Sequence, residues 1–207
     1  MEGYSRQRRV RQTRPLFVVG YEGATELNYV DSIIRHHGMA CRRAGDAENR
    51  PEILLAVTSR VAERERRKSP GRLIVPIIVL DIEVMSDDNI QELQTFAAEA
   101  KAQGIHVVVN RPKIEHWFLQ HFQPAAENMS STTVDARLAH HLQTNNLPSY
   151  TKPGSQSFFA ALAQASDDAL KHCKASGHSA YGLPCMCQPL MLVKDYASGS
   201  RSSSSSR

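Results

Sequence analysis

The feature that most constrains the fold is an almost unbroken apolar run, LIVPIIVLD, at residues 73–81. A run of this length, rich in Ile and Val, is typical of a strand buried on both faces of a helix-covered parallel sheet. Similar runs at 16–21 (LFVVGY) and 105–110 (IHVVVN) predict two more buried strands. Helical segments alternate with these runs, so we predict an α/β fold with a Rossmann-like, mostly parallel sheet flanked by helices.

Apolar residues recur at helical spacing after each predicted strand. One such stripe begins at Leu27, a second at Ile53, and a third runs from Ile90 until Gly104 interrupts it. Three further helical stretches follow Asn110 with no strand between them. The sequence therefore predicts a helical C-terminal part after the last strand.

The chain of 207 residues has the usual size of one domain, which we place at 15–197. The first 14 residues form a basic arm, because they hold five arginines against Glu2 and so account for the whole net charge of +4. Arg9 and Arg11 in this arm are candidate nucleic-acid contacts, although a solvated start of the chain explains them equally well. Residues 198–207 are a Ser-rich tail that we expect to be disordered.

No apolar run approaches the roughly 18 residues that a membrane span needs. Without a signal-peptide pattern, and with only four scattered cysteines, the sequence predicts a soluble cytoplasmic protein without a membrane partner. One stretch near the C-terminus is rich in metal-binding residue types, but its spacing matches no common two-plus-two zinc pattern, so we expect reduced structural thiols. Its members are His172, Cys173, His178, Cys185 and Cys187.

Acidic residues follow each predicted strand. Glu22 follows the first, Asp81 and Glu83 end the second, and Glu115 lies just past the third. Ligands of parallel sheets gather outside the carboxyl ends of the strands, where these acids would meet. Converging carboxylates repel one another unless a hard cation such as Mg²⁺ or Mn²⁺ binds among them. The alternative is that each acid serves only as a helix cap or first-turn residue.

Three segments carry a resemblance to a known family. YEGATE at 21–26 resembles the first Toprim motif, and VLDIE at 79–83 resembles the second, in which a strand runs into Asp-x-Asp. NRPKIEHW at 110–117 resembles the Asn-x-Pro and Glu-x-Trp segment of the RloB-like proteins. The similarity covers roughly residues 15–196 and makes the expected sheet Toprim-like.

RloB-like proteins are Toprim-related bacterial proteins of restriction and phage-defence loci, often beside an ATPase of the AAA or ABC type, and are regarded as metal-dependent nucleases. The resemblance implies the following roles in this sequence: Glu22, Asp81 and Glu115 in catalysis; Glu22, Asp81 and Glu83 in metal binding; Lys152 in phosphate contact; Glu26, Asn110 and His116 in support. Two positions depart from the family pattern. Glu83 replaces the second aspartate, and Tyr21 stands where a cysteine is common.

The leading hypothesis is therefore a nuclease that uses Mg²⁺ or Mn²⁺ to hydrolyse RNA or DNA in anti-phage defence. One alternative is a catalytically silent Toprim module that binds nucleic acid or a partner ATPase, and another is nucleotidyl transfer as in primases. The chain has no P-loop motif, so any ATPase must be a separate partner. The sequence leaves open the choice between DNA, tRNA and other RNA, and whether a homo-oligomer forms.

Overall fold

The computed structural model of the chain describes residues 13–46, 50–82, 87–126, 129–176 and 183–199. Several residues singled out from the sequence lie outside these ranges: Arg9, Arg11, Glu83 and His178. Nearly all of the basic arm and of the Ser-rich tail lies outside them as well, so both stay predictions.

A four-stranded, fully parallel sheet forms the centre of the fold, with strand order β2-β1-β3-β4. The strands are β1 (Leu16–Tyr21), β2 (Ala40–Asp46), β3 (Ile74–Asp81) and β4 (His106–Asn110). All eight residues of β3 except Asp81 are buried, which explains the long apolar run. The predicted α/β fold with a parallel sheet is confirmed.

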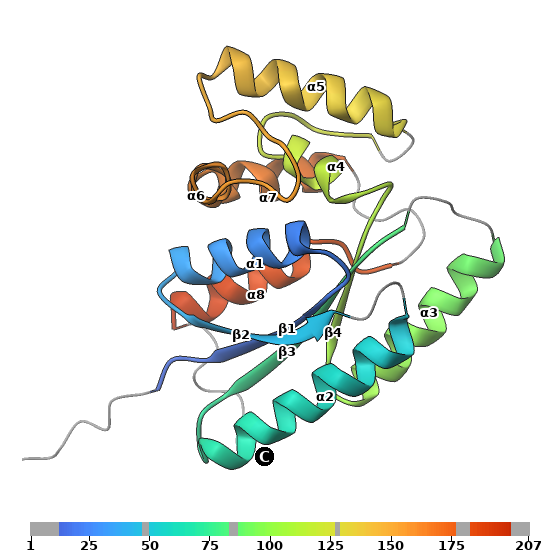
Figure 1. The fold of residues 1–207 in the computed structure, drawn as a ribbon, viewed down its shortest axis with the longest axis vertical. Coiled ribbons are helices and arrows are strands. Elements are labelled where there is room, and N and C mark those ends of the chain that lie inside the picture. The colour runs from blue at the N-terminus through green and yellow to red at the C-terminus, as the bar shows by residue number, and fades with distance from the viewer. Residues whose placement is uncertain (1–12, 47–49, 83–86, 127–128, 177–182, 200–207) are drawn as a thin grey trace, which may run out of the picture.

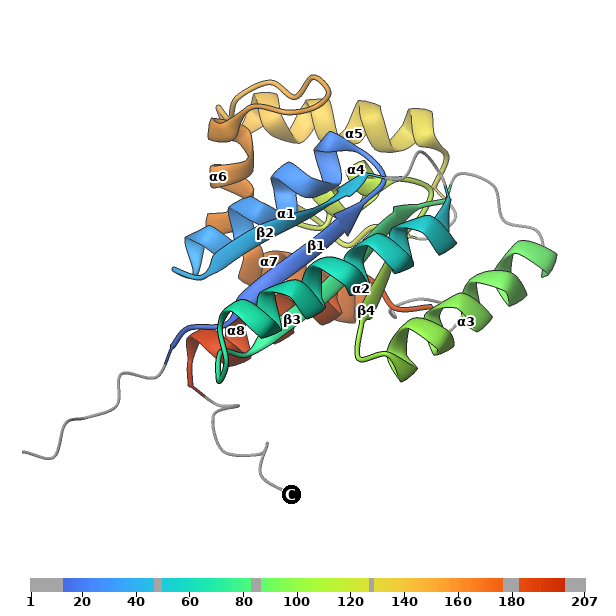
Figure 2. The same ribbon diagram turned by 60° about the horizontal axis from the view of Figure 1, so that its bottom comes forward.

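Helices cover both faces of the sheet (Figure 1). α1 (Ala24–His36) and α8 (Cys187–Ala197) lie on one face, while α2 (Pro51–Lys68) and α3 (Asp87–Ala102) lie on the other, as Figure 2 also shows. No helix within the described ranges combines the length and the apolar character that crossing a bilayer requires.

The C-terminal half adds a helical layer beyond α1 (Figure 1). It consists of α4 (Ile114–Leu119), α5 (Ser131–Thr144), α6 (Gln156–Gln164) and α7 (Ser166–Ala175). Their aromatic residues Phe118, Phe158 and Phe159 are fully or almost fully buried and join the core cluster that α1 forms on the sheet. The predicted helical C-terminal part is therefore confirmed. Within it, α6 packs on α1, and α4 contacts β4.

The strand β2 was not predicted. Its sequence, ACRRAGD, has no apolar run, and Arg42 and Arg43 are exposed. Within the described ranges β2 pairs with β1 and lies at the edge of the sheet. An edge strand can carry charged side chains, because its outer edge is not paired with another strand. A register shift opposite Val19 and Gly20 and the positive φ of Gly45 mark an irregular edge strand.

Candidate carboxylate site

The carboxyl ends of three parallel strands bring the predicted acids to one edge of the sheet. Glu22 directly follows β1 and Asp81 ends β3. Asn110 ends β4 and pairs in register with Asp81. Glu115 lies in α4, which starts four residues after β4 ends. The fold thus collects Glu22, Asp81, Asn110 and Glu115 on the side of the sheet where ligands of such folds bind.

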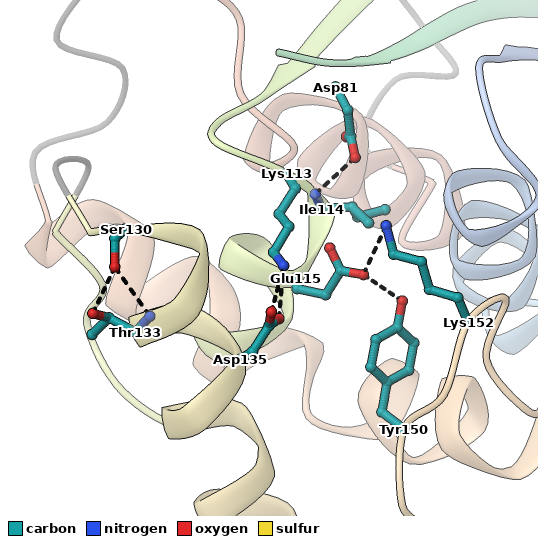
Figure 3. Close-up of polar contacts among 9 residues, drawn as sticks. All are labelled: Asp81, Lys113, Ile114, Glu115, Ser130, Thr133, Asp135, Tyr150 and Lys152. Carbon is teal, nitrogen blue, oxygen red and sulfur yellow. Dashed lines mark hydrogen bonds and ion pairs between the residues drawn. The ribbon is translucent and has the colours of Figure 1, made fainter. Parts of the chain in front are cut away.

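Asp81 is the hub of this site because its backbone and side chain contact three other segments. Its amide donates a hydrogen bond to Glu22 Oε2 at 3.0 Å. Its Oδ1 accepts from Asn110 Nδ2 at 2.9 Å, and its Oδ2 accepts from the Ile114 amide at 3.1 Å (Figure 3). The contact with Asn110 shows how that residue supports the site.

Glu26 is a central member of the site although the sequence indicated only a supporting role. It lies in the first turn of α1, where a negative charge suits the helix dipole, and its side chain is 5% exposed. The negative charge of its carboxyl group contributes to raising the pKa of Asp81. Gly23 makes room for this carboxyl group, because a Cβ at that position would lie 2.6 Å from Glu26 Oε2.

The site has an unusual electrostatic character. Burial raises the pKa of Asp81 to about 8, and the nearby negative charge of Glu26 acts in the same direction. The hydrogen bonds from Asn110 and the Ile114 amide lower the pKa only in part. Without a cation, Asp81 therefore holds a proton near neutral pH, and a bound cation would release it.

Glu115 faces two residues from the loop between α5 and α6 (Figure 3). Its side chain is 1% exposed, and its Oε1 accepts a hydrogen bond from the Tyr150 hydroxyl at 2.6 Å and lies 3.4 Å from Lys152 Nζ. Desolvation and the Glu115 charge together raise the pKa of Tyr150, so the hydroxyl stays a donor. Desolvation is the largest single influence on the pKa of Lys152 and lowers it. The charge and hydrogen bond of Glu115, together with the charges of Asp81 and Glu26, outweigh desolvation, so the net shift is upward.

Two carboxylate oxygens of the site are buried without a hydrogen-bond partner among the described residues. They are Glu26 Oε2 and Glu115 Oε2. Oxygen donors of this kind suit a hard divalent cation such as Mg²⁺ or Mn²⁺. Within the described ranges, however, the acids do not close into a group of three ligand atoms. The donor set fits the cation by its chemistry, and the cation would draw these side chains together.

The surroundings place two further predicted residues. Lys152 lies on the rim of a cavity of about 590 Å³ that also opens onto Glu115 and Tyr150. Leu138 and Leu142 of α5 also line this cavity. His116 Nε2 hydrogen-bonds the carbonyl oxygen of Ala126 at 3.0 Å, so this atom serves the loop after α4.

The sequence did not point to a role for Tyr150. This residue lies in a loop far along the chain from the strands, so it does not follow a predicted strand as the acids do. The only signal was its place in the YTK segment at 150–152, which contains Lys152. The contact with Glu115 depends on how α5 and α6 pack on α4 and α1, which is a tertiary property.

Fold and site together define a class: a parallel α/β protein with buried carboxylates at the carboxyl ends of its strands. A comparison with protein families matches residues 17–193 to the RloB-like proteins. Because the match covers most of the chain, this protein belongs to the RloB-like family. No curated protein matches the chain. No solved structure matches it.

Proposed function

We propose that this protein is a metal-dependent nuclease that hydrolyses phosphodiester bonds of RNA or DNA. The observation that carries the proposal is the pair of buried, unpartnered oxygens on Glu26 and Glu115 at the edge where Asp81 lies. A buried carboxylate oxygen without a hydrogen-bond partner is costly, so a ligand that binds it is the simplest reason for its presence.

In this proposal, some residues of the site would bind the metal ion, and others would position those ligands or contact the substrate. Asp81, Glu26 and Glu115 would hold Mg²⁺ or Mn²⁺, while Glu22 steadies Asp81 through its amide. The ion would supply a Lewis acid for the phosphodiester and lower the pKa of a bound water. Tyr150 fixes Glu115 through their hydrogen bond. Lys152, on the cavity rim, would contact a phosphate of the substrate.

Two wider features remain predictions from the family resemblance. One is a role in anti-phage defence, and the other is an ATPase partner of the AAA or ABC type. Membership of the RloB-like family is the support for both proposals. Neither changes the chemistry expected at the carboxylates.

The second candidate function is a catalytically silent module that binds nucleic acid or a partner protein. One observation favours it: both oxygens of Asp81 accept hydrogen bonds from the protein, and Glu115 Oε1 is paired with Tyr150 and Lys152. In this function the acids would hold β3, β4 and α4 together. The difference from the first candidate lies in cleavage alone.

The test is a cleavage assay on the full chain with labelled tRNA, single-stranded RNA and plasmid DNA, in Mg²⁺, Mn²⁺ or chelator. We expect cleavage that requires the metal and falls on the order of 100-fold or more in Asp81→Asn. The side chain keeps its size but loses its charge, and one of its two accepting oxygens becomes an NH2 group that cannot accept a hydrogen bond. Glu26→Gln should lose activity to a similar extent. The matched control is Glu52→Gln, an exposed acid in the first turn of α2.

The outcomes separate the two functions. Cleavage that persists in chelator or in Asp81→Asn would contradict the metal-dependent nuclease. Binding of a nucleic acid with no cleavage in any metal would favour the silent module. Titration with Mn²⁺ should show binding to the wild type and to Glu52→Gln, and weakened binding to Glu26→Gln.

A further inference from the structure

A second group of ligand atoms lies away from the acids, between α7 and the start of α8. The sulfur atoms of Cys173, Cys185 and Cys187 all lie within 4.8 Å of one another. Cys173 belongs to α7, whereas Cys187 is the first residue of α8. The three thiols therefore meet only because these two helices pack together.

The distances suit a metal better than a disulfide. Cys173 Sγ and Cys185 Sγ lie 3.7 Å apart. A disulfide bond needs about 2.05 Å. A tetrahedral zinc site with Zn–S bonds of about 2.3 Å places its sulfurs roughly 3.8 Å apart. The Cys173–Cys185 distance already matches that edge, and the third thiol needs to move by less than about 1 Å to complete the triangle.

Burial also distinguishes the group from ordinary surface thiols. Cys187 is 1% exposed and Cys173 is 5% exposed, while Cys185 is partly exposed at the edge of the main core cluster. Two sulfurs are thus shielded from solvent and the third faces an accessible side.

We infer that Cys173, Cys185 and Cys187 supply three of the ligands of a site for a thiophilic divalent cation, best suited to Zn²⁺. Sulfur ligands favour Zn²⁺ over Mg²⁺ and Mn²⁺, so this site would bind a different metal from the one proposed for the carboxylates. His172 Nδ1 contacts the carbonyl oxygen of Gln120 at 2.7 Å. Among the described residues no fourth ligand atom joins the three sulfurs within 4.8 Å.

The position of the site suggests what the ion stabilises. Pro184, next to Cys185, accepts a hydrogen bond through its carbonyl from the Val109 amide at 2.9 Å. This contact covers the outer edge of β4, the strand whose last residue, Asn110, holds Asp81. An ion on the three sulfurs would fasten α7, α8 and this covering segment to one another.

The first experiment measures the zinc content of the purified full chain by elemental analysis after exposure to zinc and gel filtration. We expect about one bound ion per chain, as for other structural sites. Cys173→Ser, Cys185→Ser and Cys187→Ser should each lose it. Cys41→Ser is the matched control, because Cys41 lies in β2 and is not part of the group. Asp81→Asn should also keep the zinc, which separates this site from the proposed nuclease site.

A second measurement on the wild-type chain avoids variants that fail to fold. Alkylation of each cysteine is followed by peptide mass spectrometry with and without added Zn²⁺. Bound zinc should slow alkylation of the three clustered cysteines by tenfold or more, since the ion occupies the reactive sulfurs, and should leave Cys41 unchanged. Equal rates with and without zinc, or a disulfide between Cys173 and Cys185 in the purified chain, would overturn the inference.

Discussion

Buried polar side chains in this protein follow two opposite patterns. Tyr29 accepts a hydrogen bond from Trp117 Nε1 at 2.6 Å, and its hydroxyl lies 3.2 Å from His121 Nε2. His121 Nδ1 in turn faces the carbonyls of Trp117 and Phe118. Burial lowers the pKa of His121 to about 4 and raises that of Tyr29, so the chain of contacts stays neutral. Glu26 and Glu115, by contrast, each have a buried carboxylate oxygen with no hydrogen-bond partner among the described residues.

Removing the hydroxyl of Tyr29 tests the structural role of that chain. Tyr29→Phe leaves Trp117 Nε1 and His121 Nε2 buried without a partner, so we expect a loss of about 1–3 kcal/mol in the free energy of unfolding. Urea unfolding measures the change, and a double-mutant cycle with Trp117→Phe isolates the contact. A change within measurement error would contradict this account of the hydrogen bonds.

The second prediction at the residue scale concerns Lys152, which lines the cavity and whose Nζ lies 3.4 Å from Glu115 Oε1. If it contacts a substrate phosphate, Lys152→Ala weakens nucleic-acid binding for all sequences alike and lowers the salt slope by about 1. Binding is measured by fluorescence anisotropy over a series of salt concentrations. Lys171→Ala, at an exposed position on α7, serves as the control. Equal salt slopes in the two variants would remove Lys152 from the interface.

At the scale of elements, the packing of β1 on α2 depends on one glycine. A Cβ at Gly20 would collide with Thr58 Oγ1 and lie 3.1 Å from Leu54 Cδ1. We therefore expect Gly20→Ala to reduce stability by about 1–3 kcal/mol through overpacking. Thr58→Ala should recover part of this loss because it removes the colliding Oγ1, which has no hydrogen-bond partner among the described residues. Thermal unfolding of both single variants and the double variant measures the coupling, and simple additivity would argue against the collision.

The elements that could be predicted from the sequence are those whose burial shows as a local pattern of apolar residues. β1, β3 and β4 are apolar on both faces, so their runs are continuous. The edge strand β2 gains its place from pairing with β1 alone, and nothing in its charged sequence shows that. The sequence singled out the cysteines but did not predict that their sulfurs meet, because the packing of α7 on α8 determines this rather than the spacing of the residues.

The candidate site was predictable to the extent that topology determines it. Glu22, Asp81 and Glu115 lie near strand ends, and parallel strands bring their carboxyl ends together. The importance of Glu26 depends on the direction in which the first turn of α1 points. The contact of Glu115 with Tyr150 depends on the conformation of a loop. Those are details of three-dimensional packing that a strand-end rule does not contain.

At the scale of the whole molecule, the two sets of candidate ligands border the same strand. The carboxylates lie at the carboxyl end of β4, and the cysteines adjoin the segment that covers its outer edge. Their ligand atoms differ, oxygen in one and sulfur in the other, so each set would select its own metal. The core that α1 builds with α4, α6 and α8 joins the two regions into one body.

This layout makes global stability depend on the charge of Asp81. Between its ordinary pKa and about 8, the folded protein keeps a proton on Asp81 that the unfolded chain has lost. Raising the pH over that range in chelator therefore favours unfolding, by at most about 1.4 kcal/mol per pH unit. Buried His121, whose pKa is lowered, acts in the opposite direction up to its unfolded pKa, so the comparison must be between variants.

Asp81→Asn isolates the contribution of Asp81, because the amide cannot lose a proton in this range. We expect the variant to gain stability relative to the wild type as the pH rises from about 4 to about 8, measured by urea unfolding in chelator. Saturating Mn²⁺ should narrow the difference, since an ion that binds only the folded wild type stabilises it by mass action. If the free energy of unfolding depended on pH in the same way for the two proteins, Asp81 would be ionised in the folded protein. The carboxylates of the site would then be able to carry their charges side by side without a bound cation.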